Sequence, residues 1–119
     1  KNFNGNFDII SFFDCLHDMG DPVGAIKYAK TKLNKNGIIM LVEPTADDLP
    51  ENNFNIMGQL YYSFSTIACI PASKSQEIGM GLGAQAGPKK LFEILNDGGF
   101  TDVKVTYKTA SNMVIQAKV

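Results

Sequence analysis

Residues 7–22, FDIISFFDCLHDMGDP, decide the fold of this chain, because an apolar run leads directly into a short acidic loop. Residues 7–13 are mostly Phe and Ile, which predicts a strand buried on both faces, as in a parallel sheet. The loop after it carries Asp14, His17 and Asp18, and His17 is the only histidine of the chain. In open α/β sheets, ligands bind in a crevice at the strand tips. An enzyme site is therefore the first hypothesis.

The residues that follow the first strand and its loop predict a helix and a second strand. Asp21 is a typical N-cap, and Pro22 suits the first helical position. The apolar positions Val23, Ile26, Ala29 and Leu33 recur at helical spacing, and Asn36 and Gly37 are expected to end the helix. Residues 38–42, IIMLV, predict a second buried strand that ends at Glu43. Because such crossovers are right-handed and join parallel strands, Glu43 should face the same crevice as His17.

The second half of the chain predicts two more helices and a hairpin. A helix is expected over residues 55–70, ended by Pro71, with an apolar stripe that belongs mostly to the core and shares one or two positions with a pocket. Three further segments are expected: a loop over residues 72–87 with a turn of helix near Gln76, a last helix from Pro88 to the glycines at 98 and 99, and an antiparallel hairpin formed by residues 103–107 and 113–117.

Composition narrows the classes of function. The 119 residues suit one domain, and a formal net charge of -1 argues against nucleic acid as a partner. No apolar run approaches the roughly 20 residues that a membrane-spanning helix needs. Cys15 and Cys69 are too few for a disulfide scaffold, so a reduced, cytoplasmic protein with a small-molecule substrate is expected. The chain begins at Lys1 rather than Met, which suggests a truncated product.

Two motifs have a less specific interpretation beside the functional one. Residues 79–84, GMGLGA, fit the G-x-G-x-x-G/A dinucleotide fingerprint, but no strand precedes them and no helix follows directly, which favours a flexible loop. Cys15 lies two residues from His17 and could be a thiol nucleophile with its base. No third residue is placed to orient that pair, so an incidental cysteine is the favoured interpretation.

The acidic residues around His17 could also be interpreted as a metal site. Asp14, His17, Asp18 and Glu43 offer hard and borderline ligands. Such sites usually contain spaced histidine pairs, and this chain has a single histidine, so no metal is expected. His17 itself could be structural, bonded to a backbone carbonyl. Its convergence with Glu43 favours a functional role, because a carboxylate on one ring nitrogen leaves the other nitrogen able to accept a proton.

Three stretches together resemble a known family. They are LHDMGDP at residues 16–22, KNGIIMLVEP at residues 35–44, and a helix that ends in GGF at residues 98–100 before a hairpin. The order resembles the C-terminal part of class I S-adenosylmethionine-dependent methyltransferases over nearly the whole chain. LHDMGDP is most similar to the LHDWxDE stretch of small-molecule O-methyltransferases that carry an N-terminal winged-helix dimerisation domain.

The resemblance implies a fold and an assembly. The fold would be α/β, a Rossmann-like methyltransferase half-domain with a mixed sheet of about four strands in the family order 4-5-7-6, a C-terminal antiparallel hairpin and helices packed on the sheet. Residues 1–119 would be a single partial domain, the C-terminal portion of the catalytic domain. The cofactor would be S-adenosyl-L-methionine, the partner a small-molecule methyl acceptor, and a homodimer is compatible with the family.

The resemblance also implies roles for individual residues. His17 would be the general base and Glu43 would orient it. Phe13 and Asp14 would touch the methionine end of the cofactor. The methyl acceptor would contact Asp18, Met57 and Tyr61. The chain departs from the family at Met19, where Trp is usual, and at Gln85, which stands roughly where a second acidic partner is typical.

The resulting hypothesis is methyl transfer to a hydroxyl of a small molecule, with His17 as the base, in the intact protein. The first three strands of the family fold are missing from this sequence, so the chain by itself is expected to be inactive. Two alternatives stay open. One is N- or C-methylation with a structural His17, and the other is a non-catalytic half-domain that serves as an assembly module.

Overall fold

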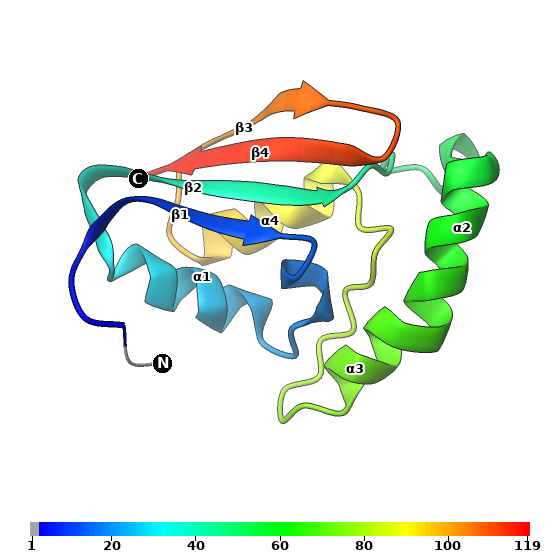
Figure 1. The fold of residues 1–119 in the computed structure, drawn as a ribbon, viewed down its shortest axis with the longest axis horizontal. Helices are drawn as coiled ribbons and strands as arrows, with labels where there is room; N and C mark the ends of the chain where they lie inside the picture. Colours follow the sequence, from blue (N-terminus) through cyan, green and yellow to red (C-terminus); the bar gives the residue numbers. More distant parts are fainter. Residues whose placement is uncertain (1–2) are drawn as a thin grey trace.

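A computed structural model describes residues 3–119 and contains a mixed four-stranded sheet in the order β1-β2-β4-β3. The strands are β1 (Phe7–Phe13), β2 (Leu33–Pro44), β3 (Asp102–Lys108) and β4 (Asn112–Lys118). Strands β1 and β2 are parallel, and β4 runs antiparallel to both of its neighbours, β2 and β3 (Figure 1). The predicted fold class, strand pairing and C-terminal hairpin are confirmed.

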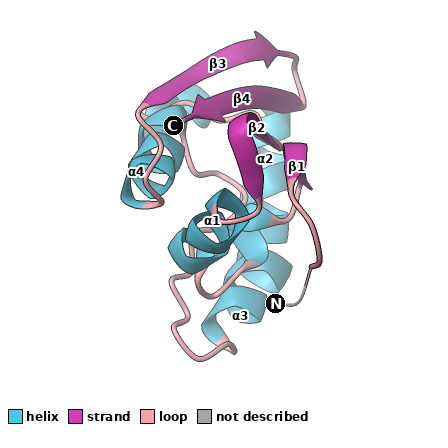
Figure 2. Ribbon diagram, turned by 90° about the vertical axis from the view of Figure 1, so that its left-hand side faces the viewer, coloured by secondary structure: helices cyan, strands magenta, loops and turns pink. Residues whose placement is uncertain are grey.

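The longer helices are α1 (Pro22–Lys30), α2 (Ile56–Phe64), α3 (Ile70–Lys74) and α4 (Pro88–Asp97). Short helical segments are the 3-10 turns η1 (Leu16–Asp18) and η2 (Pro50–Asn53) and the π-helical turn η3 (Ser65–Cys69). Helices α1 and α4 lie side by side beneath the sheet (Figure 2), while α2 stands beyond the end of β2 (Figure 1). No helix in residues 3–119 is long and apolar enough to cross a membrane.

The core lies between the sheet and the pair α1 and α4. Alternate residues of β2 and β4 point toward these helices, as the two-residue period of a strand requires. The largest fully buried apolar side chains are Leu16, Ile26, Ile39, Leu41, Leu91, Ile94, Leu95, Phe100, Met113 and Ile115. The same alternation brings Glu43, two residues after Leu41, onto the buried face at the end of β2. A carboxylate is thereby positioned at the boundary of the core.

The first strand differs from the prediction. It was expected to be buried on both faces, yet β1 is largely exposed, with Ile9 56% and Phe13 62% accessible. The reason is its place at the edge of the sheet, because within residues 3–119 no strand pairs with its outer side. An apolar run indicates that a strand is suited to burial, but it does not show whether another element covers that strand.

The first helix and second strand meet earlier than predicted. Helix α1 ends at Lys30, and Leu33 already pairs with Phe7 in β1. Between this pair and the next, Ile9 with Ile38, β2 contains the extra residues of a bulge. Asn36 and Gly37 therefore belong to an irregular part of the strand rather than to the end of a helix.

The second helix also corrects two expectations. Pro71 does not end it, because α2, the π-turn η3 and α3 follow one another without a break, and the π-turn directly before Pro71 lets the helical path continue. Most of the apolar stripe is exposed rather than core, with Ile56 84% and Ile67 74% accessible. Tyr61 is the partly buried exception.

Candidate active site

A buried histidine and glutamate meet where β1 and β2 end. His17 lies on η1, just after β1, and Glu43 is the second-last residue of β2. His17 is 4% exposed and Glu43 is 2% exposed. The Nδ1 atom of His17 is hydrogen-bonded to Oε2 of Glu43, and the backbone N–H of Leu16 donates to Oε1 of the same carboxylate at 3.0 Å. The sequence predicted this juxtaposition from the parallel strands, and the structure shows it.

The pairing decides the electrostatics of His17. An unpaired buried carboxylate would be costly, and both oxygens of Glu43 have a partner here. Burial lowers the pKa of His17, but the hydrogen bond and charge of Glu43 outweigh burial, with smaller contributions from Asp18 and Asp14, so the pKa is raised. With Nδ1–H donating to Glu43, the neutral ring has Nε2 as its acceptor.

The second ring nitrogen of His17 faces two further side chains. Oδ1 of Asp18 lies 3.3 Å from Nε2, and that oxygen is buried without a hydrogen-bond partner among the described residues. The thiol of Cys69, on η3, completes a group whose three ligand-type atoms all lie within 4.8 Å of one another. Burial, followed by the contact with Asp18, raises the pKa of Cys69 to about 11.

A cavity of about 230 Å³ adjoins the pair. It is lined by Asp14, His17, Pro44, Tyr61, Phe64, Ala68, Cys69 and Ala84. The structure therefore brings Asp14 and Tyr61, two of the residues selected from the sequence, to the same cavity as His17. Met57 lies elsewhere, in a cavity shared with Thr45 and Lys108. Phe13 is exposed at the end of β1 and does not line the His17 cavity.

Asp14 has an unusual backbone conformation. Its φ of 44° makes it the one non-glycine residue with positive φ in the described part of the chain. Its N–H donates to the carbonyl of Val42 at 2.8 Å, and its Oδ1 accepts from Nδ2 of Asn112 at 2.8 Å. Positive φ costs a non-glycine residue of order 1–3 kcal/mol, and such strain concentrates at functional sites. The two bonds hold Asp14 at the edge of the cavity.

The His17 loop is held by residues that the sequence did not single out. Oγ of Ser73 donates to the carbonyl of Met19 at 2.8 Å. Gln76 accepts from the N–H of Gly20 at 2.7 Å and donates to the carbonyl of Asp18 at 2.9 Å. The sequence predicts a loop over residues 72–87 with a turn of helix near Gln76, whereas the helical residues are the first three, which belong to α3. No sequence signal indicates that this segment contacts a loop more than fifty residues earlier.

The glycine-rich segment at residues 79–84 is a loop, as predicted, and has no strand before it. Gly79, Gly81 and Gly83 all have positive φ, which glycine adopts without strain. The N–H of Gly83 donates to the carbonyl of His17 at 3.3 Å. This segment therefore supports the His17 loop.

Cys15 is not favoured as a nucleophile. Burial raises the pKa of the Cys15 thiol, which disfavours the thiolate that a nucleophile requires.

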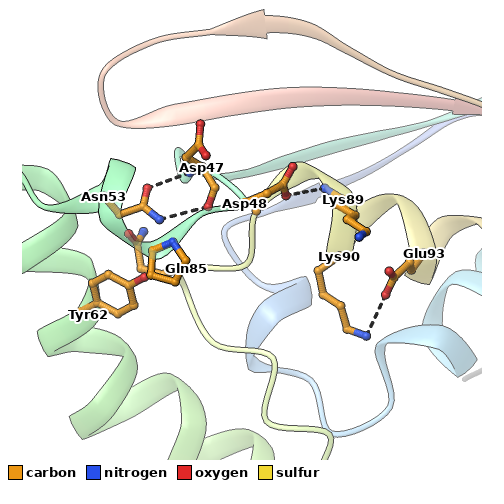
Figure 3. A pocket seen from close by; sticks show the side chains of 10 residues that line it. Asp47, Asp48, Asn53, Tyr62, Gln85, Lys89, Lys90 and Glu93 are labelled. Atoms are coloured by element: carbon orange, nitrogen blue, oxygen red, sulfur yellow. Dashed lines mark hydrogen bonds and ion pairs between the residues drawn. The ribbon is translucent and has the colours of Figure 1, made fainter.

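Gln85 lies in a different, polar cavity of about 320 Å³, close to Tyr62 (Figure 3). Other polar groups there satisfy one another: Asn53 exchanges hydrogen bonds with the backbone of Asp47, and Asp48 accepts from the N–H of Lys89 at 2.8 Å. Gln85 and His17 line different cavities. The place where the resemblance expects a second acidic partner is therefore not part of the His17 cavity.

Comparison with known proteins identifies the fold. No family profile and no curated protein sequence matches the chain. Among solved structures, human N-acetylserotonin methyltransferase in complex with SAM matches with a TM-score of 0.69 and 19% identity, over 99% of this chain and 31% of that chain. PigF with SAH matches with a TM-score of 0.66 and 12% identity, over 97% and 31%.

A third solved structure is an O-methyltransferase family protein from Burkholderia thailandensis, with a TM-score of 0.64 and 16% identity, over 97% of this chain and 31% of that one. The chain thus spans about 31% of the length of these matched proteins. At these identities the likeness concerns the fold. The chain has the mixed α/β fold of a methyltransferase half-domain, with the strand order and C-terminal hairpin that the resemblance implies.

Proposed function

We propose that this chain is the C-terminal portion of an S-adenosyl-L-methionine-dependent methyltransferase that methylates a hydroxyl of a small molecule, with His17 as general base. The observation that carries the proposal is the buried pair of His17 and Glu43, set at two strand tips beside a cavity. Two of the matched structures are complexes with SAH and with SAM, which supports the cofactor, and a third is an O-methyltransferase family protein, which supports the acceptor class.

The residues present suit one end of the cofactor. The cavity of about 230 Å³ is smaller than the roughly 300–1,000 Å³ typical of ligand pockets, so this chain would hold only part of the cofactor together with the acceptor. Asp14 would contact the methionine end, and Tyr61, together with Asp18 beside His17, the acceptor. Phe13 and Met57 do not line this cavity and are given no role in the proposal. When bound, the cofactor supplies an electrophilic methyl group on a sulfonium.

The proton transfer follows from the tautomer. With Nδ1–H bonded to Glu43, the Nε2 lone pair of His17 would accept the proton of the acceptor hydroxyl as that oxygen takes up the methyl group that the cofactor supplies. Glu43 then stabilises the imidazolium. Positioning of the two reactants would supply most of the rate, and the base about 10²- to 10⁴-fold.

A second candidate keeps the methyltransferase but makes His17 structural. The observation in its favour is that both ring nitrogens face carboxylates, Glu43 at Nδ1 and Asp18 at Nε2. Such a histidine could remain protonated and simply fix its loop. The acceptor would then be a nitrogen or carbon nucleophile that does not need this base.

A third candidate is an assembly module, favoured by the exposed apolar edge strand. Within residues 3–119 the outer edge of β1 has no strand partner, and Ile9 and Phe13 are exposed on it. Such edges template strand-to-strand association. If this candidate holds, the wild-type chain should self-associate in sedimentation, and Ile9→Lys should lower that self-association. A wild-type chain that sediments as a monomer, with no change in Ile9→Lys, would exclude it.

The deciding experiment uses the longer protein that contains this chain, with methyl-labelled S-adenosylmethionine and a panel of phenols and amines. We expect label on phenols and a loss of about 10²- to 10⁴-fold in kcat for His17→Ala. Cys15→Ser is the matched control in the same loop and should keep the wild-type rate. Unchanged turnover of His17→Ala, or label on amines alone, would overturn the base assignment.

A further inference from the structure

We propose that His17, Asp18 and Cys69 form a binding site for a divalent ion of the zinc type. This inference goes beyond the methyltransferase proposal and does not depend on it. The sequence indicated no metal, because a single histidine lacks the usual spaced partner. The structure supplies the missing ligand by bringing Cys69 to His17 from 52 positions further along the chain.

The separations fit a tetrahedral ion. Nitrogen and oxygen ligands each lie about 2.0–2.1 Å from zinc, which places two of them roughly 3.3 Å apart at the tetrahedral angle. Nε2 of His17 and Oδ1 of Asp18 are 3.3 Å apart in this structure. A zinc-bound sulfur would lie about 3.6 Å from either atom. The thiol of Cys69 is within 4.8 Å of both, so it needs to move by at most about an ångström.

The chemistry of the three groups also fits. Imidazole, thiolate and carboxylate are the ligands that zinc uses in proteins, and three protein ligands with a fourth position open are typical of accessible zinc sites. His17 and Cys69 both line the cavity of about 230 Å³, which leaves room for water or a ligand at the fourth position. Oδ1 of Asp18 is buried, and among the described residues its only polar neighbours are Nε2 of His17 at 3.3 Å and the thiol of Cys69, so an ion between the three groups would satisfy it.

Glu43 provides the outer support that a metal-binding histidine normally has. Such histidines usually donate their other ring N–H to a carboxylate, which fixes the tautomer and raises the basicity of the ligating nitrogen. His17 already does this, with Nδ1 bonded to Glu43 and Nε2 facing Asp18 and Cys69. The Glu43 carboxylate is held in turn by the N–H of Leu16. The site is therefore preorganised at two of its three ligands.

Binding would release the thiol proton of Cys69, whose sulfur bonds the ion as a thiolate, and also the Nε2 proton of every His17 that is protonated at the pH of the experiment. The π-turn η3 carries Cys69, and single π-helical turns recur at functional sites. If His17 is the base of the proposed function, an ion on Nε2 would occupy the lone pair that accepts the proton. Zinc would then inhibit methyl transfer reversibly, and this last consequence alone depends on the proposed function.

The test is a titration of the 119-residue chain with Zn²⁺ in competition with a chromophoric chelator, together with Co²⁺ absorption, which reports thiolate ligation. We expect one ion per chain and a cobalt–thiolate band. Cys69→Ser should abolish the band, while Cys15→Ser, which changes the chain's other cysteine, should keep it. Glu43→Gln should weaken Zn²⁺ affinity by about 10- to 100-fold through the lost support of His17.

Circular dichroism of each variant shows whether it is folded. Should Cys69→Ser unfold, Asp18→Asn gives the same information from a partly exposed position, and it should also weaken Zn²⁺ binding. Absence of stoichiometric binding to the wild-type chain would overturn the proposal. Equal affinity in Cys69→Ser and wild type would do the same, since the ion would then lie elsewhere.

Discussion

Replacing Glu43 by Gln removes one charge from the centre of the site while keeping the shape of the side chain. In the wild type, Glu43 raises the pKa of His17 against the opposing effect of burial. Without that charge, burial dominates and the pKa of His17 should fall below its ordinary value of about 6.5. The amide oxygen of Gln can still accept from the N–H of Leu16, so the loop itself should persist.

The size of the effect follows from the bonds lost. A hydrogen bond to a charged group contributes about 1.5–3 kcal/mol, and the Nδ1 bond to Glu43 is fully buried. We expect Glu43→Gln to lose roughly that much free energy of unfolding near pH 6. Each unit by which the pKa of His17 falls is worth about 1.36 kcal/mol.

The sign of the pH dependence should reverse. A histidine with a raised pKa stabilises the folded state most below the unfolded pKa of about 6.5, and this contribution disappears as the pH rises through the folded pKa. In Glu43→Gln, the unfolded chain binds the proton more readily, so stability should fall as the pH drops below about 6.5.

The assay uses the fact that His17 is the sole histidine. Its ring protons give unambiguous NMR signals for a pKa measurement, and urea unfolding at several pH values gives the stability. Asp21→Asn, which keeps an N-capping side chain at α1, is the matched control and should leave the His17 titration in place. An unchanged pKa of His17 in Glu43→Gln would refute the reasoning.

Three further predictions concern the frame around the site. Leu95→Ala, at a fully buried position, should lower the free energy of unfolding by roughly 2–5 kcal/mol, whereas Leu60→Ala, on the exposed face of α2, should change it by less than about 0.5 kcal/mol. Equal losses of the two variants in urea unfolding would contradict the placement of the core. Gln76→Ala removes the two bonds that Gln76 makes to the His17 loop and leaves the Ser73 bond to Met19 in place, so hydrogen exchange at the Gly20 amide should accelerate, and an unchanged rate would mean that the Gly20 amide is protected otherwise. Calorimetric titration of the 119-residue chain with S-adenosylmethionine should show no tight binding; stoichiometric tight binding would contradict the half-site account.

The local elements followed from the sequence because their signals are local. Asp21 and Pro22 mark the start of α1, and the alternation at residues 113–117 marks β4. The meeting of His17 with Glu43 could also be predicted, since it needs only two parallel neighbouring strands that end at the same edge. These parts of the account depend on periodicity and on the handedness of the crossover.

Other features could not be predicted, because they depend on contacts between distant segments. The apolar residues Ile9 and Ile56 suit burial, but nothing in their pattern says that their side chains are left exposed. Pro71 is a helix breaker by rule, yet the π-turn before it lets the helical path continue. That turn also carries Cys69 beside His17, a proximity that no sequence spacing indicates.

In the proposed function, His17, held by Glu43, accepts the proton of a hydroxyl acceptor. Its most direct test is the pH dependence of single-turnover methyl transfer to a phenol, from about pH 5 to 8, in the longer protein that contains this chain. We expect the rate to fall as His17 becomes protonated, and we expect this fall to occur at lower pH in Glu43→Gln. A flat profile in both proteins would contradict it.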